Sequence, residues 1–181
     1  MVSAAAVERA LLQELLRVCS GLAPPEGRLA DSVRAIHDCN RALWDLEDAV
    51  RKTDEAAEVA SLKRRIDDAN ISRHRAVDAF DAYVARQIAP RQASDAHVVN
   101  SESFGEMVDR GSILALKHSV LPAGPQRDHV RCRWDHLMGC LARCVEAAGE
   151  GAVRLVPRRE VKLYGRGRAP TADVPEPEGG S

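Results

Sequence analysis

The sequence has no excess of charge of either sign and no long hydrophobic run. Its 26 lysine and arginine residues balance 27 aspartate and glutamate residues, so no global field favours nucleic acid or another polyanion. Glu8, Arg9, Glu14 and Arg17 interrupt the apolar stretch at the start of the chain, which argues against a signal peptide or a membrane-spanning helix. We therefore expect a cytoplasmic protein with no membrane partner.

Runs of alternating apolar and polar residues are missing at the length that a β-sheet needs. Apolar residues return every three or four positions instead, which is typical of amphipathic helices. With 45% apolar and 29% charged residues in 181 positions, the chain has the composition and length of one globular domain. The sequence predicts an all-α bundle of about five helices over residues 1–168, with long central antiparallel helices. The end of this domain is basic and can be extended, and residues 169–181 are predicted to form a disordered tail.

Common catalytic and metal-binding signatures are absent from the sequence. It contains no glycine-rich phosphate loop, no nucleophile elbow, no CxxC pair and no paired Glu-x-x-His motifs of a di-iron bundle. The five cysteines are an odd number and lie in helical patterns, so reduced thiols are expected. Cys140, Cys144 and His136 share a helix face, but small core positions explain this spacing better than a zinc site does. We expect no metal, and the sequence indicates no particular cofactor.

Five segments have helical periodicity and are bounded by glycine, proline or a capping residue. Asp54 is the predicted N-cap of the third helix, and Pro90 ends it. Residues 91–104 are predicted to form a loop. The five predicted helices cover residues 3–19, 29–52, 54–88, 105–121 and 126–148.

Polar residues stand on the helical stripes where apolar residues are expected. Asn40 and Glu47 occupy such positions on the second helix, and Asn70 and Arg73 on the third. Buried polar groups need partners. One interpretation is structural: pairs such as Glu47 with Arg64, or Asn40 with Arg73, fix the register of the two helices.

Several segments of the chain resemble the bacterial domain-of-unknown-function family 4254. The resemblance is carried by Asn40, Leu43-Trp44, Glu47-Asp48 and Arg51, by Lys63-Arg64, Ile66-Asp67, Asn70 and Arg73, by ESFGEMVDRGSILALKH from Glu102 onward, and by Lys162-Leu163-Tyr164. These blocks occur in the family's order over roughly residues 30–165. The resemblance implies a helical bacterial protein without an assigned activity. Some family members accompany polysaccharide or lipopolysaccharide glycosyltransferases, so the resemblance implies carbohydrate or related small-molecule pathways.

The second interpretation of the polar residues is a pocket between helices, in which arginine and lysine hold an anionic group. Glu47 and Asp109 are the candidate catalytic residues, because a carboxylate in such a pocket can carry a proton. Tyr164 and Lys162 match the last block of the resemblance and are candidates to fold back over the pocket. The candidate ligand-binding residues are Asn40, Trp44, Asp67, Asn70, Arg73, Arg110, Lys117 and Tyr164.

Two functions fit this architecture, and the sequence leaves both open. The first is a bacterial biosynthetic-pathway protein that binds, and in the catalytic version transforms, a small anionic sugar, nucleotide or amino-acid derivative. The second is a non-catalytic interaction or scaffold module, either a homodimer or a partner of a biosynthetic enzyme. An exposed apolar face on the first helix would favour the second function.

Overall fold

The chain forms an all-α bundle, as the sequence predicts. The computed structural model describes residues 3–22, 28–89, 98–99 and 101–154, so the predicted tail lies outside the described residues. The helices are α1 (Ala4–Cys19), α2 (Arg28–Val50), α3 (Ala56–Ile88), α4 (Phe104–Val120) and α5 (Pro125–Gly149), with a 3-10 turn η1 (Ser20–Leu22) after α1. The strands β1 (Val98–Val99) and β2 (Val153–Arg154) have two residues each and pair in parallel. Each predicted helix boundary is confirmed to within two residues.

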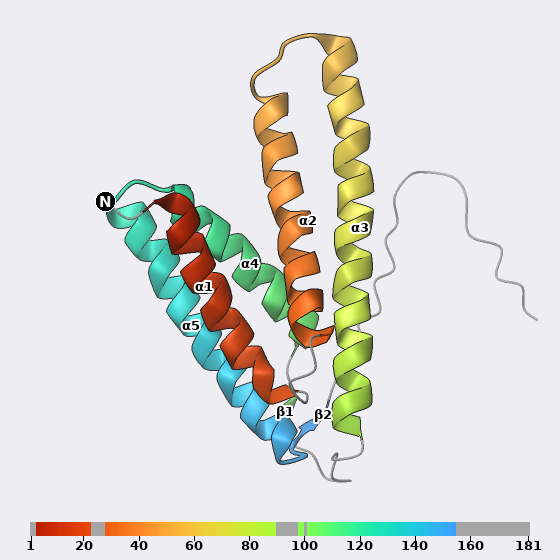
Figure 1. The fold of residues 1–181 in the computed structure, drawn as a ribbon, viewed down its shortest axis with the longest axis vertical. Helices are drawn as coiled ribbons and strands as arrows, with labels where there is room; N and C mark the ends of the chain where they lie inside the picture. The colour runs from red at the N-terminus through yellow and green to blue at the C-terminus, as the bar shows by residue number, and fades with distance from the viewer. Residues whose placement is uncertain (1–2, 23–27, 90–97, 100, 155–181) are drawn as a thin grey trace, which may run out of the picture.

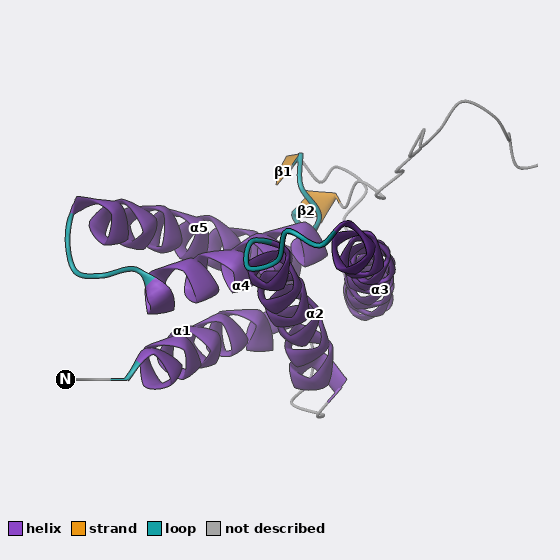
Figure 2. Cartoon of the chain, turned by 90° about the horizontal axis from the view of Figure 1, so that it is seen from above, coloured by secondary structure: helices purple, strands orange, loops and turns teal. Residues whose placement is uncertain are grey.

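The helices form a hairpin and a layer. Helices α2 and α3 make a long hairpin, which stands beside the layer of α1, α4 and α5 (Figure 1). The connected end of the hairpin projects beyond the other helices, and the view from above separates α3 from that layer (Figures 1 and 2). Helix α4 contacts α1, α2, α3 and α5. It is therefore the element on which the hairpin and the layer meet.

Helix α4 begins at a capping box. The Ser103 hydroxyl accepts a hydrogen bond from the Glu106 amide at 3.1 Å, and the Glu106 carboxylate accepts one from the Ser103 amide at 2.8 Å. Phe104, predicted as the last loop residue, is instead the first residue of α4, and its side chain is buried. The loop prediction was wrong at this position because the capping box makes Ser103 the N-cap, so the helix starts at the next residue.

The start of α4 packs closely on the C-terminal third of α3. The Asp81 carboxylate on α3 accepts a hydrogen bond from the Gly105 amide at 2.7 Å. A Cβ atom at position 105 would lie 2.9 Å from the carbonyl oxygen of Val77, closer than real Cβ contacts. Glycine at position 105 therefore permits the contact by which a carboxylate of α3 caps α4.

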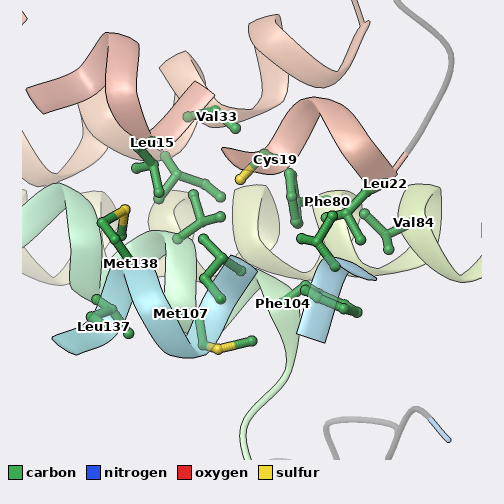
Figure 3. Close-up of a cluster of buried hydrophobic side chains, with 14 of the residues drawn as sticks. Leu15, Cys19, Leu22, Val33, Phe80, Val84, Phe104, Met107, Leu137 and Met138 are labelled. Atoms are coloured by element: carbon green, nitrogen blue, oxygen red, sulfur yellow. The ribbon is translucent and has the colours of Figure 1, made fainter. Parts of the chain in front are cut away.

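The hydrophobic core fills the junction of the hairpin and the layer. Leu15 and Cys19 from α1 meet Phe80 and Val84 from α3 there, and Met107 from α4 lies in the same cluster (Figure 3). Leu137 and Met138 from α5 lie in the same cluster, so the first and the last of the described helices contribute to one core.

Helix α3 begins differently from the prediction. It starts at Ala56 with Glu55 as its N-cap, and the Glu55 side chain makes no capping hydrogen bond. Thr53 provides the polar contacts of this turn, since its hydroxyl donates to Glu58 at 2.6 Å and accepts from the Glu55 amide at 3.3 Å. The prediction of Asp54 as N-cap was wrong because Thr53, one residue earlier, takes the local hydrogen bonds. Among the described helices, none combines the length and the apolar character that crossing a membrane requires.

Candidate functional site

A pocket of about 300 Å³ lies between α2, α3 and α4. This volume is at the lower end of the range of about 300–1,000 Å³ that is typical of small-molecule sites. Its lining residues come from the polar stripes that the sequence analysis identified, together with apolar neighbours. They are Asn40, Leu43, Trp44, Glu47, Arg51, Asn70, Arg73, Ile113 and Lys117.

The pocket has more positive than negative groups. Arg51, Arg73 and Lys117 line it, against the single carboxylate of Glu47 among its lining residues. Arg51 is paired with Asp48 at 2.7 Å. Within the described ranges, neither Arg73 nor Lys117 has a carboxylate partner. The polar residues of the two stripes therefore leave a cationic cavity instead of neutralising one another.

Arg73 is half-buried, whereas the other two cations of the lining, Arg51 and Lys117, are exposed. Its Nε atom is buried and has no hydrogen-bond partner among the described residues. One of its terminal nitrogens lies 3.3 Å from Nε2 of His74. The predicted pair of Glu47 with Arg64 was wrong, because Arg64 is exposed and lies outside the pocket lining. Asn40 and Arg73 do lie in one place, on two walls of the pocket.

Behind the pocket, a buried hydrogen-bond chain connects α1, α2 and α4. His37 Nε2 lies 2.8 Å from Oε1 of Glu8, and His37 Nδ1 lies 2.9 Å from Oγ of Ser112. Because a carboxylate only accepts, Nε2–H of His37 donates to Glu8, and Nδ1 accepts the Ser112 hydroxyl proton. Arg41 pairs with the same Glu8 oxygen from the surface side. The three buried members are fully satisfied without any ligand.

Asn40 extends this chain to the pocket. Its amide nitrogen donates to Ser112 Oγ at 3.1 Å and to the Asp109 carboxylate at 2.8 Å. Asn40 is 4% exposed and also lines the pocket. Asp109 does not line the pocket, so it acts on the pocket by holding Asn40.

The Ser112–His37–Glu8 chain has the residue types of a hydrolase triad but not its accessibility. Ser112 is completely buried, so no substrate reaches its hydroxyl. Burial also lowers the pKa of His37, which the Asp38 carboxylate opposes only in part. Arg41 pairs with the Glu8 carboxylate and so reduces the degree to which that carboxylate stabilises a doubly protonated His37. This hydrogen-bond chain therefore contains a neutral histidine. It connects α1, α2 and α4 and holds the Asn40 side chain in place.

The structure brings most of the predicted site residues together. Asn40, Trp44, Glu47, Asn70, Arg73 and Lys117 line the pocket. Asp67 is exposed and lies outside the lining of this pocket. Arg110 pairs with Glu102 and lines a different pocket, so the structure does not place it with the other candidates. Tyr164 and Lys162 lie outside the described residues.

The sequence patterns did not single out four participants: Glu8, His37, Ser112 and Arg51. Glu8 had a usable signal, since it precedes Leu11 and Leu15 by three and seven positions and so shares their buried stripe. His37 stands three positions before Asn40, which places both on one face of α2. Ser112 had no signal of its own, because a serine inside an apolar helix is common in cores.

A second pocket of about 510 Å³ lies between α4 and α5 and contains Arg110, Cys132, His136 and Cys140. Cys140 Sγ is 3.7 Å from His136 Nε2 and accepts a hydrogen bond from Arg143 at 3.3 Å. All five cysteines are free thiols. Across the described part of the chain, no three histidine, cysteine or acidic side chains converge closely enough to hold a metal ion.

Fold and pocket define an all-α protein with a cationic cavity between three helices. The chain belongs to the family described as protein of unknown function (DUF4254), which matches residues 30–144. That range includes every residue lining the pocket between α2, α3 and α4, whereas Glu8 precedes it. Neither a curated protein nor a solved structure matches the chain.

Proposed function

We propose that the pocket between α2, α3 and α4 binds a small anionic metabolite, a sugar, nucleotide or amino-acid derivative, in a bacterial biosynthetic pathway of the cytoplasm. The observation that carries this proposal is the pair of Arg73 and Lys117, which line the cavity with no carboxylate partner in the described residues. The argument is strongest for Arg73, which is half-buried, because an uncompensated charge near the interior is costly; Lys117 is exposed and adds positive charge at the edge of the pocket.

Arg73 supports an anion in particular. A buried donor without a partner costs about 1–3 kcal/mol, and its Nε is such a donor. A phosphate or carboxylate in the pocket would accept hydrogen bonds from the guanidinium group in the fork geometry that arginine favours. Lys117, on the opposite helix, would add a second positive charge to the same group.

The remaining lining suits a metabolite with an apolar or planar part. Trp44 is half-buried and provides a ring face, with Leu43 and Ile113 as apolar neighbours. Asn40 and Asn70 provide amide groups for orientation. This mixture of a few polar groups with apolar walls is typical of small-molecule sites.

Glu47 is the residue that would move a proton if the protein transforms its ligand, because it is the carboxylate of the lining. Asp109 supports the site through Asn40 and is not placed to touch a ligand there. Once a substrate is known, Glu47→Gln should retain binding and abolish turnover. Unchanged turnover would make Glu47 a binding residue only.

The proposal is tested by a thermal-shift screen against phosphorylated sugars, nucleotides, amino acids and carboxylic acids. A ligand at 100 times its Kd stabilises the fold by about 2.7 kcal/mol, which raises Tm by about 5–10 °C for a chain of this size. We expect the shift to disappear in Arg73→Leu and Lys117→Met. Arg75→Leu is the matched control, because Arg75 is exposed on the same helix outside the pocket.

Two results would overturn the proposal: no shift with any compound, or an equal shift in Arg73→Leu. The competing function is a non-catalytic interaction module, which predicts an apolar surface on α1. In the described ranges, the large hydrophobic side chains that stand exposed are Ile71 on α3 and Val120 on α4. The metabolite pocket is therefore the function that we favour.

A further inference from the structure

Asn40 stands between the pocket and the buried hydrogen-bond chain, and that chain determines which atom of its amide group a ligand meets. The amide nitrogen has two hydrogens. One is donated to the Asp109 carboxylate at 2.8 Å, and the other to Ser112 Oγ at 3.1 Å. Both donors of the side chain are thus used inside the protein.

The amide oxygen of Asn40 has a different position. Among the described residues, no group donates a hydrogen bond to it. In that part of the chain, this oxygen is not one of the fully buried polar atoms that lack a hydrogen-bond partner, so it is not sealed inside the protein. Asn40 lines the pocket, and the pocket is therefore where this oxygen is accessible. The group that Asn40 offers to the cavity is therefore an acceptor.

The amide group cannot reverse without loss. A flip would place its oxygen against the Asp109 carboxylate, where two acceptors repel. It would also remove the donor from Ser112, whose own proton is committed to His37 Nδ1. His37 cannot compensate, because Glu8 already takes its Nε2 proton. Five residues on three helices therefore fix one orientation.

We propose that the ligand of this pocket is a hydroxylated anion, which donates a hydroxyl proton to the Asn40 oxygen while Arg73 and Lys117 hold its anionic group. This inference rests on the proposed function and restricts it to a class: sugar phosphates, polyol phosphates or hydroxy acids, and not a plain alkyl phosphate. A fixed acceptor disfavours a ligand that has no hydrogen-bond donor. Such a ligand displaces the water from the acceptor and gives it no hydrogen bond in return.

Two matched pairs of probes test the inference by isothermal titration calorimetry at low ionic strength. Glucose 1-phosphate is compared with cyclohexyl phosphate, and glycerol 3-phosphate with propyl phosphate. Each pair has one phosphate and a similar carbon frame, and only one member has hydroxyls. We expect the hydroxylated member of at least one pair to bind roughly 3- to 10-fold more tightly, the effect of one hydrogen bond.

The variants assign that preference to Asn40. Asn40→Leu should abolish it. Ser112→Ala should reduce it without touching the ligand, because Ser112 is completely buried and lies outside the lining. Ser119→Ala is the control, since Ser119 is a buried serine of α4 whose hydroxyl donates to the Leu116 carbonyl and not to Asn40. Circular dichroism checks that each variant is folded. If Asn40→Leu is unfolded, the hydroxyl preference of Ser112→Ala by itself tests the inference.

The possible outcomes separate this inference from the proposed function. Equal affinities within both pairs, with binding still lost in Arg73→Leu, would overturn the inference and leave the anion pocket intact. A hydroxyl preference that survives in Ser112→Ala at wild-type strength would also overturn it, because the buried chain would then not be its cause. If none of the four phosphates binds, this inference fails together with the phosphate version of the proposed function.

Discussion

His37 Nε2 lies 2.8 Å from Glu8 Oε1, and this contact joins α1 to α2 inside the bundle. Helix α1 precedes the range that matches the family, so the first helix is tied to the matched part of the chain through a polar contact as well as through core leucines. Through Ser112, the same contact continues to Asn40 at the pocket wall. The packing of α1 and the geometry of the pocket are therefore linked.

Glu8→Ala should destabilise the fold by about 1–3 kcal/mol, because it leaves the buried Nε2–H group of His37 without an acceptor. Urea unfolding monitored by circular dichroism measures the change. Glu8→Gln keeps an acceptor oxygen and should lose less. Arg9→Ala, at the exposed neighbouring position, should stay within about 0.5 kcal/mol of the wild type. Equal effects of Glu8→Ala and Arg9→Ala would contradict the role of the contact.

The stability of the fold should fall as the pH falls below the ordinary pKa of histidine. Burial lowers the pKa of His37 in the folded state, so between about pH 6.5 and the lower folded pKa the unfolded chain binds the extra proton. The contribution of neutral His37 is complete above that window and is lost on acidification, with a slope of at most about 1.4 kcal/mol per pH unit.

Urea unfolding of the wild type and of His37→Gln between pH 7.5 and 5.5 isolates this effect. The difference between the two free energies of unfolding should shrink as the pH falls. His118 has a pKa lowered in the same direction by burial and by Arg127 and Arg131, and it contributes equally to both proteins. A difference that is independent of pH would show that His37 does not change its protonation on unfolding.

Gly105→Ala should destabilise the protein by about 1–3 kcal/mol, because the new methyl group would press on the Val77 carbonyl and push α4 away from α3. Gly139→Ala is the matched control in α5, where a Cβ meets only the end of the Arg143 side chain at 3.6 Å. That change should stabilise by up to about 1 kcal/mol through helix propensity. Thermal unfolding compares the two, and a stabilising Gly105→Ala would disprove the close contact.

The cysteines should react with iodoacetamide in an order set by burial. Cys19 is completely buried, and burial raises its pKa to about 12, so it should stay unmodified in the native protein at pH 8. Cys132 is exposed and should be modified first. Peptide mass spectrometry after timed alkylation gives the order, and urea should make Cys19 reactive. Early modification of Cys19 would mean that α1 detaches readily from the core.

Local periodicity determined the helices, because 3.6-residue spacing, proline and glycine act within a few residues of one another. It also identified the polar positions that stand on buried stripes, such as Asn40 and Arg73. It failed at Asp54 and Phe104, where the choice between neighbouring capping residues depends on contacts that periodicity does not contain.

Only the tertiary structure decided which polar residues meet. Two helices can be rotated and shifted against a third in several ways that bury the same apolar stripes, and each way brings different side chains together. The observed packing places Asn40, Arg73 and Lys117 around one cavity and turns Asp67 and Arg110 away from it. It also brings Glu8 to His37 across 29 positions of sequence, a pairing that no local pattern contains. The sequence by itself determined an all-α bundle with polar residues inside, and packing decided that these residues form a cavity with an anchored asparagine.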